Sequence, residues 1–380
     1  MNGAKCAGRS FAYTHFPIRK ARHQRMSIFH SKKRAAVLLA ATIATATVLA
    51  GCASGDETPA GGDGDAASFG ELNLQLSWIK NEEFSGEFLA DANGYYEEAG
   101  FTKVNMTAGP STGTAELLSG TADVALSDAI SVGSVIAEEE APLTIIGATY
   151  QKNPFTILSL ADGGNILTAE DMIGKKIGVQ DSNASLFAAL LASNGIDASE
   201  LTIVPVLYDP SVLINGDVDG FMAYLTNESL TVAAQGYEVA NLPFADNGLP
   251  FVAETITTTD TYIASDREKL KAFLYAEIKG WSDAVNDPAA GSKLAVEVYG
   301  ADLGLDPDVS LAGATAQAEQ LVVSDDTVAN GLFTISEELQ SETIASLKAA
   351  GIEVTAEDLF DMSLLAEVYD EHPDLVAYAG

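Results

Sequence analysis

Aromatic, amide and acidic side chains follow the ends of several predicted β-strands in this sequence. They are Trp78, Asn81, Asp128, Tyr150, Gln151, Asn153, Asp181, Asn183, Tyr208, Asp209, Tyr224, Asn227 and Glu228. In open α/β sheets, ligands bind beyond the carboxyl ends of the strands, so we expect these side chains to converge on one site. Aromatic side chains stack on flat rings, and amides and carboxylates orient such rings through hydrogen bonds. The set therefore suits a flat heteroaromatic molecule.

Most of these residues also have a simpler structural interpretation. A Tyr at a strand end commonly packs at the rim of a sheet, and Asp128 or Asn183 can cap the helix that follows it. Asp209 precedes a proline and can belong to a turn. Trp78 suits ligand contact best, because a Trp between polar residues directly after an alternating strand is unusual for a core. The interpretation therefore depends on the whole set.

The charges near these strand ends bear on the charge of the ligand. They comprise the basic residues Lys80 and Lys152 and the acidic residues Glu82, Glu83, Asp128, Asp209 and Glu228. This excess of acidic residues favours a neutral or partly cationic ligand. An oxyanion would have to rest on backbone N–H groups at helix N-termini.

Short apolar runs alternate with amphipathic segments from residue 71 onward, which predicts α/β domains. The predicted strands are Leu72–Ser77, Lys103–Thr107, Val124–Ser127, Thr144–Thr149, Phe155–Ala161, Lys176–Gln180, Thr202–Leu207 and Val218–Ala223. The predicted helices include Glu83–Ala99, Thr112–Ser119, Ala129–Glu139, Ala184–Ser193 and Asn227–Gln235.

This strand-helix rhythm runs twice, and Asn153-Pro154 marks the change because proline favours extended geometry in the residue before it. Phe251–Thr258 predicts a second extended crossing, and the long helix Asp266–Asn286 follows it. Two lobes joined by two crossings form a hinge with a ligand cleft between them. The expected lobes are residues 70–153 with 255–380, and residues 154–254.

The N-terminal region has the pattern of an export signal. Lys32-Lys33-Arg34 precedes an apolar run, Ala35–Ala50, that is shorter than the roughly 20 residues of a membrane-spanning helix. Leu49-Ala50-Gly51-Cys52 resembles a bacterial lipobox, in which Cys52 would carry a diacylglyceryl group. We therefore expect residues 1–51 to be removed, with Met1 and Met26 as candidate start sites.

The residues after the predicted cleavage site indicate how the protein would be held. Residues 52–69 are small and polar and predict a flexible tether. Two or more acyl chains hold a protein stably at a membrane, whereas one chain binds reversibly. We expect a protein anchored through Cys52 to the extracytoplasmic side of the cell membrane.

The composition excludes several classes of function. Nine of the 20 basic residues and none of the 54 acidic residues precede Cys52, which leaves 11 basic residues and a formal balance of −43. Such a chain would repel phosphate backbones, so we expect no nucleic-acid binding. After processing, Cys52 and His372 are the remaining Cys and His. We therefore expect no disulfide within the chain, no Cys/His metal site and no Ser-His-Asp triad.

Five segments resemble solute-binding proteins related to fungal thiamine-pyrimidine synthase, a group that includes importers of thiamine pyrimidine precursors and of riboflavin. They are Trp78–Phe88, Asn93–Gly100, Ser119–Asp128, Ile173–Val179 and Asn215–Tyr224. The resemblance covers about residues 71–285, and sulfonate- and nitrate-binding relatives share some of these segments. It implies a two-lobed periplasmic-binding-protein fold of type II. It also implies aromatic stacking from the Trp78 region, with Phe84 where pyrimidine-binding members have a His, a change that could favour a larger ring such as a flavin.

These observations support three functional hypotheses. The first is capture of a heteroaromatic vitamin or precursor by lobe closure, with delivery to an ABC permease and ATPase by a monomer without cofactor. The second is binding of an aliphatic sulfonate, taurine, nitrate or a similar oxyanion by the same class of protein. The third is a surface enzyme that acts through carboxylates such as Asp128 and Glu228. We expect no synthase activity, because the fungal enzyme consumes its own His and uses a Cys-rich iron-binding loop with a Lys-bound pyridoxal phosphate.

Overall fold

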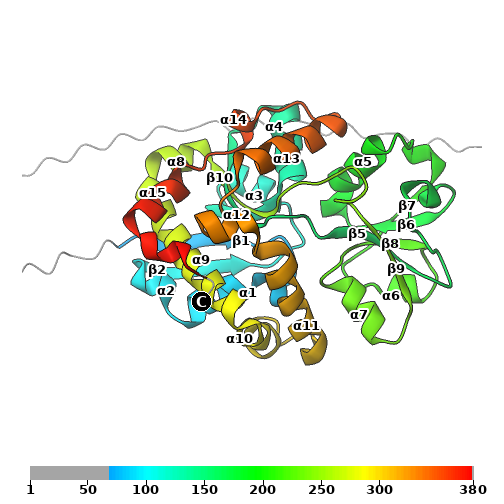
Figure 1. Ribbon diagram of the computed structural model, residues 1–380, viewed down its shortest axis with the longest axis horizontal. Helices are drawn as coiled ribbons and strands as arrows, with labels where there is room; N and C mark the ends of the chain where they lie inside the picture. Colours follow the sequence, from blue (N-terminus) through cyan, green and yellow to red (C-terminus); the bar gives the residue numbers. More distant parts are fainter. Residues whose placement is uncertain (1–67, 379–380) are drawn as a thin grey trace, which may run out of the picture. The chain divides into compact units, whose positions relative to one another are not determined.

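The computed structural model describes residues 68–378. The predicted export signal, Cys52 and nearly all of the predicted tether lie outside these residues. The described chain forms two five-stranded sheets with helices around them (Figure 1). None of the helices in this part of the chain combines the length and apolar character needed to cross a bilayer.

The first sheet has the strand order β2-β1-β3-β10-β4. Its strands are β1 Gly70–Gln75, β2 Phe101–Thr107, β3 Val124–Asp128, β4 Leu143–Tyr150 and β10 Ala253–Thr259. β1 pairs in parallel with β2 and β3, whereas β10 is antiparallel to both β3 and β4. The sheet thus contains a strand that comes from much later in the chain than its neighbours.

The second sheet has the order β7-β6-β8-β5-β9. Its strands are β5 Phe155–Leu160, β6 Lys176–Val179, β7 Thr202–Pro205, β8 Gly220–Tyr224 and β9 Val239–Pro243. β6 is parallel to β7 and β8, and β5 is antiparallel to β8 and β9. All eight strands expected from the sequence are present, and β9 is an additional one.

The chain passes between the two sheets twice. The first passage is residues 151–154, where Asn153-Pro154 predicts it. The second passage lies between the end of β9 and the start of β10, at residues 244–252. Most of the expected crossing Phe251–Thr258 is β10 itself, because this segment finds hydrogen-bonding partners on both sides in the first sheet. The expected lobe boundary after residue 254 therefore falls inside a strand.

The helices largely follow the expected segments. They are α1 Ser85–Ala92, α2 Tyr95–Glu98, α3 Thr114–Ser119, α4 Ala129–Glu139, α5 Ala184–Ser193, α6 Ser211–Ile214, α7 Glu228–Ala234, α8 Asp260–Ser265, α9 Arg267–Asn286, α10 Pro288–Leu294, α11 Pro307–Gln317, α12 Asp325–Asn330, α13 Glu337–Ala349, α14 Ala356–Leu359 and α15 Ser363–Glu371. The single helix expected over Glu83–Ala99 is divided, because Gly94 takes the left-handed conformation with φ 76° between α1 and α2.

Two glycines allow α1 to approach α9 closely. A Cβ atom on Gly86 would lie 2.2 Å from Cγ of Trp281, and a Cβ atom on Gly280 would lie 2.2 Å from the carbonyl oxygen of Gly86. Trp281 is fully buried at this contact. The 3₁₀ turn Glu82–Phe84 leads directly into α1, so the packing of α1 on α9 also fixes the position of this turn.

Gly86→Ala is therefore expected to destabilise the protein. The added methyl group overlaps the Trp281 ring, and overpacking of this kind typically costs about 1–3 kcal/mol of unfolding free energy. Urea denaturation followed by tryptophan fluorescence measures the change. Gly163→Ala is the control, because its Cβ atom would lie 3.3 Å from Cβ of Leu160 in a loop. Equal stability of the two variants would contradict the proposed close contact.

Candidate ligand-binding site

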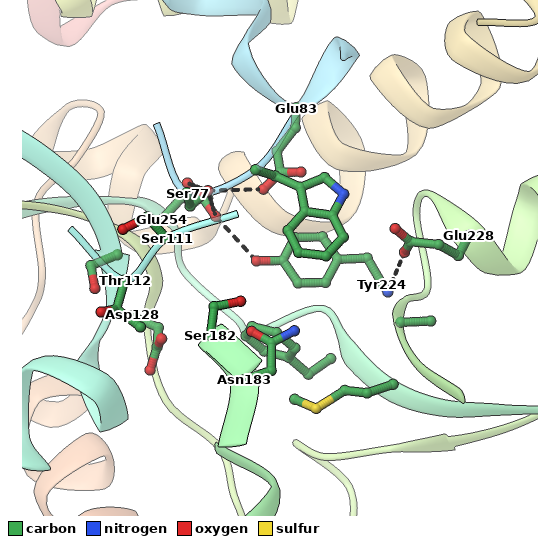
Figure 2. Close-up of a pocket in the computed structure, with 15 residues that line it drawn as sticks. Ser77, Glu83, Ser111, Thr112, Asp128, Ser182, Asn183, Tyr224, Glu228 and Glu254 are labelled. Carbon is green, nitrogen blue, oxygen red and sulfur yellow. Dashed lines mark hydrogen bonds between the residues drawn. The ribbon is translucent and has the colours of Figure 1, made fainter. Parts of the chain in front are cut away.

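A pocket lies at the strand ends of both sheets (Figure 2). The space between its side chains, including the part open to solvent, is about 490 Å³. It is lined by Ser77, Trp78, Glu83, Ser111, Thr112, Ser127, Asp128, Phe155, Ser182, Asn183, Met222, Ala223, Tyr224, Glu228 and Glu254.

Five of the predicted site residues line this pocket, namely Trp78, Asp128, Asn183, Tyr224 and Glu228. They come from four separate segments of the chain, and all four segments reach this one pocket. Asp128 is the last residue of β3 and Tyr224 is the last residue of β8. The strand-end argument therefore brings together residues that are far apart in the sequence and belong to both sheets.

Six other predicted residues do not line the pocket. Phe84 and Tyr150 are fully buried in the core, where Tyr150 Oη donates a hydrogen bond to Oε1 of Gln317 at 2.8 Å. Asn153 is buried and donates through Nδ2 to the carbonyl oxygen of Leu249 at 2.8 Å. Tyr150 ends β4 and Asn153 follows it, whereas Phe84 lies in the 3₁₀ turn before α1. All three side chains are packed inside the fold and do not reach the pocket.

The remaining three lie outside the pocket for different reasons. Asn81 is buried within the fold, with no hydrogen-bond partner for its side chain among the described residues. Tyr208 follows the edge strand β7 and is exposed, which places it on the surface. Asn227 precedes α7 at its N-terminus, while its neighbour Glu228 lines the pocket. A strand-end position alone therefore does not determine the direction of a side chain.

The alternative role as a helix cap is confirmed for Asp128. Its Oδ1 accepts a hydrogen bond from the backbone N–H of Ser131 at 2.8 Å, and the same residue also lines the pocket. Burial raises the pKa of Asp128, although the hydrogen bonds from Ser131 oppose this effect. Asn183 makes no such cap and instead donates through Nδ2 to Oε1 of Gln180 at 2.9 Å.

Glu254 is a pocket residue that the sequence interpretation missed. It occupies a register shift of β10 and has φ 45°, a left-handed conformation that is uncommon for a residue other than glycine. Bulges of this kind redirect a side chain from the normal alternation of a strand. The Glu254 carboxylate accepts hydrogen bonds from Ser77 Oγ at 2.9 and 3.0 Å and from Tyr224 Oη at 3.1 Å (Figure 2). Tyr224 belongs to the second sheet, so this contact joins the two sheets.

Glu83 lies beside Glu254 on the pocket wall. The Ser77 hydroxyl group reaches both carboxyl groups, because its Oγ lies 3.4 Å from Oε1 of Glu83 and 2.9 Å from Oε1 of Glu254. Burial raises the pKa of Glu83 well above its usual range, and repulsion from Glu254 adds to this effect. Burial likewise raises the pKa of Glu254 to about 7, while its hydrogen bonds oppose the rise. The pair therefore holds a proton near neutral pH.

Glu228 adds a fourth carboxyl group to the pocket. It accepts a hydrogen bond from the backbone N–H of Tyr224 at 2.9 Å, and burial raises its pKa to about 7. No Lys, Arg or His is found among the described residues that line the pocket. The part of the chain that the structure describes also contains no group of His, Cys, Asp or Glu side chains suited to a metal ion.

Aromatic rings form another part of the pocket wall. Phe155 and Tyr224 meet edge to face with their ring centroids 4.7 Å apart, and Trp78 lines the same space. Ser111, Thr112, Ser127 and Ser182 supply hydroxyl groups. A flat ring could stack on these aromatic side chains while its polar atoms contact hydroxyl, amide and carboxyl groups. The geometry thus offers noncovalent recognition of a small ring compound.

Solved structures share this arrangement of two sheets. The alkanesulfonate-binding protein SsuA from Xanthomonas axonopodis pv. citri, bound to MOPS, matches with a TM-score of 0.58 and 17% sequence identity. The match covers 80% of this chain and 99% of that protein. The chain therefore has the periplasmic-binding-protein fold, as the sequence predicts.

Sequence comparisons identify the family. The NMT1/THI5 like family model matches residues 81–291, more than half of the chain, so the protein belongs to the NMT1/THI5-like family. The riboflavin-binding protein RibY of Chloroflexus aurantiacus is 23% identical over 299 residues, which are 74% of this chain and 81% of that protein. The 4-amino-5-hydroxymethyl-2-methylpyrimidine phosphate synthase of Schizosaccharomyces pombe is 27% identical over 235 residues, 58% of this chain and 67% of that enzyme. These matches confirm the resemblance seen in the sequence.

A second pair of buried carboxyl groups lies outside the pocket, between α1 and α9. Trp281 Nε1 donates a hydrogen bond to Oε1 of Glu87 at 3.2 Å, and the Tyr96 hydroxyl group donates to Glu277. Burial raises the pKa of Glu87 to about 8, and burial together with repulsion from Glu87 raises the pKa of Glu277. Both groups therefore keep their protons in the folded protein at neutral pH.

We expect the stability of the ligand-free protein to fall as pH rises from about 4.5 to about 8. In this range the folded protein holds a proton on Glu87 that the unfolded chain releases, since the ordinary pKa of Glu is about 4.5, and the raised pKa of Glu277 acts in the same direction. Each such group lowers the unfolding free energy by about 1.4 kcal/mol per pH unit. Urea denaturation at a series of pH values measures the slope.

The variants Glu87→Gln and Glu277→Gln are expected to reduce this slope, each by about the contribution of one carboxyl group. Glu97→Gln on the exposed surface of α2 is the control and should leave the slope unchanged. A stability that is constant or rises over this pH range would contradict the assignment of protonated carboxyl groups to the core.

Proposed function

We propose that this protein is an extracytoplasmic solute-binding lipoprotein of an ABC importer. We propose further that it binds a small heteroaromatic vitamin or vitamin precursor, such as a thiamine pyrimidine precursor or riboflavin. The family and the periplasmic-binding-protein fold support the class of protein. The name of the relative RibY, a riboflavin-binding protein, supports a ring compound as ligand. A monomer that closes its two lobes over the ligand would deliver it to a permease and ATPase.

The main support for a heteroaromatic ligand is the combination of side chains in the pocket. The aromatic rings of Trp78, Phe155 and Tyr224 line the same pocket as hydroxyl, amide and carboxyl groups. Ligand pockets of this kind use apolar and aromatic walls for affinity and a few polar groups for orientation. A heteroaromatic ring uses both parts of this wall.

An oxyanion is the second candidate ligand, because the fold is shared with an alkanesulfonate-binding protein. The pocket gives it little support. Four carboxyl groups line the space, and the described lining residues include no cationic side chain. The N-terminus of α4, where an anion could rest, already receives the Asp128 carboxylate through the N–H of Ser131. A sulfonate would therefore be repelled by the carboxyl groups, and it would find few hydrogen-bond donors in the pocket.

A carboxylate-dependent enzyme is the third candidate. One relative is a pyrimidine phosphate synthase, but its identity to this chain is 27%. His372 is the one His in the described residues, and its ring packs against Tyr275 with centroids 4.6 Å apart, away from the pocket. The pocket carboxyl groups are held by Ser77, Tyr224 and backbone N–H groups. This arrangement favours a carrier that returns its ligand unchanged.

The ligand class can be tested by thermal unfolding of the soluble domain without Cys52. We expect a ring compound from a panel of hydroxymethylpyrimidine, formylated aminopyrimidine, riboflavin and thiamine to raise the melting temperature. At a ligand concentration of 100 times Kd, the gain in unfolding free energy is about 2.7 kcal/mol. Taurine and nitrate represent the oxyanion alternative. Stabilisation by an oxyanion and by none of the ring compounds would refute the proposed ligand class.

The Trp78→Ala variant separates these candidates further. Loss of ring stacking and of buried apolar area should weaken binding of a ring compound by about tenfold or more, as calorimetry can measure. Tyr208→Ala is the matched control, because this aromatic residue is exposed and outside the pocket. For an oxyanion ligand, Trp78→Ala would have no effect and binding would weaken strongly with salt.

The lipid anchor can be tested in cells. Replacement of Cys52 by Ala removes the thiol that would carry the diacylglyceryl group. The expected result is loss of metabolic labelling by palmitate and transfer of the protein from the membrane fraction to a soluble fraction. A protein that keeps its label and its membrane association after this change would be anchored in another way. Cys6→Ala provides the control and should change neither readout.

A further inference from the structure

The carboxyl groups of Glu83 and Glu254 form a pair whose charge is not balanced within the pocket. Both side chains are at most 4% exposed, and each donor that reaches them, Ser77 Oγ or Tyr224 Oη, is a neutral hydroxyl group. The salt bridges of the described chain involve other residues. Both carboxyl groups lie within 3.4 Å of the same Ser77 oxygen atom, and two buried carboxyl groups this close cannot both ionise without a cation beside them. The ligand-free pair is therefore a carboxylic acid with a carboxylate.

The hydrogen-bonding capacity of this wall is incomplete. Oε2 of Glu83 is buried and has no partner among the described residues, and the same is true of the hydroxyl group of Ser127. Both residues line the pocket (Figure 2 labels Glu83). One oxygen atom each of Glu87 and Glu277 is also buried without a partner, but these two residues do not line the pocket, whereas Glu83 and Ser127 do. An unpaired buried polar group costs roughly 1–3 kcal/mol, and at Glu83 a ligand in the pocket can supply the missing donor. The free acceptor therefore points to a donor supplied by a ligand.

The position of Glu254 is maintained despite an unfavourable backbone conformation. Its φ of 45° and the register shift of β10 direct the carboxylate to the pocket instead of into the regular sheet alternation. Residues in such conformations cost of order 1–3 kcal/mol and cluster at functional sites. Together with the unpartnered groups, this geometry indicates that the carboxyl pair serves binding.

We infer that the ligand carries a protonated nitrogen, and that this group binds between the Glu83 and Glu254 carboxyl groups in exchange for their shared proton. The inference rests on the proposed function, which it makes more specific by assigning a positive charge to the ring compound. The cation enters the pocket and the proton leaves to solvent, so the pair becomes two carboxylates against one bound positive charge. A donor on the ligand then satisfies the free Oε2 of Glu83.

Other titratable groups around the pair act in the same direction. They are Glu82, Glu87, Asp128, Glu228, Tyr150 and Tyr224. All of them are acidic groups, so each ionisation in this region makes the site more favourable for a cation. Burial raises the pKa of Glu254 to about 7 and also raises the pKa of Glu83, so the pair holds a proton below neutral pH.

A charge series on one ring tests the inference directly. The probes are benzylamine, benzyl alcohol and phenylmethanesulfonate, which carry a positive, zero and negative charge on a ring of the same size. We expect benzylamine to bind at least about tenfold more tightly than benzyl alcohol, and the sulfonate to bind least. Calorimetry or ligand-observed NMR gives the three Kd values.

The proton exchange gives a second readout that simple attraction to the pocket would not produce. Benzylamine keeps its charge from about pH 5.5 to 8, so its Kd should fall by up to about tenfold per pH unit while the pair is protonated, and then level off. The Kd of benzyl alcohol should be constant over this range. Glu83→Gln should abolish both the preference for the amine and its pH dependence.

The control is Glu277→Gln, which alters a buried carboxyl group outside the pocket and should retain both effects. If Glu83→Gln does not fold, Glu254→Gln provides the same test. The inference is overturned if benzylamine binds no more tightly than benzyl alcohol, or if its Kd is independent of pH. Binding of neutral riboflavin in that case would leave the proposed function intact, whereas failure of the whole vitamin panel would remove both.

Discussion

The pocket depends on burying several carboxyl groups without a cationic side chain beside them. Glu254 is held by the hydroxyl groups of Ser77 and Tyr224, and Glu83 lies against it with one oxygen atom free. Buried charges are costly unless they are paired, so these groups retain protons until a partner arrives. This constraint makes the wall of the site acidic, and under the proposed exchange of a proton for a bound cation it would make ligand binding depend on pH. It also connects the two sheets, because Tyr224 ends a strand of the second sheet and Glu254 lies in the first.

The fold provides this arrangement through two local departures from regular structure. The bulge in β10 turns Glu254 toward the pocket, and the close approach of α1 and α9 at Gly86 and Gly280 fixes the turn that carries Glu83. Both features depend on contacts between distant parts of the chain. β10 pairs with β3 and β4, and α1 packs on α9. Changes in packing far from the pocket can therefore alter the spacing of its carboxyl groups.

Proteins with this fold include binding proteins for quite different ligands. The solved SsuA protein is an alkanesulfonate-binding protein, and the relative RibY is a riboflavin-binding protein. A shared architecture does not determine a ligand, because specificity resides in the side chains of the site. In this chain the aromatic rings, the acid pair and the capped N-terminus of α4 together oppose an anionic guest. The aromatic and hydroxyl-bearing part of the pocket wall supports the proposal of a ring compound as ligand.

The sequence by itself determined the α/β alternation, the position of the first passage at Asn153-Pro154 and the meeting of Trp78, Asp128, Asn183, Tyr224 and Glu228. These features depend on hydrophobic periodicity, proline geometry and strand ends, which are local properties of the chain. Only the tertiary structure decided that Phe84 and Tyr150 belong to the core and that Glu254 belongs to the pocket. The directions of Tyr150 and Glu254 depend on how β10 inserts between β3 and β4, strands more than 100 residues earlier in the chain, and on the left-handed conformation of Glu254 at the register shift. The direction of Phe84 depends on the packing of α1 on α9.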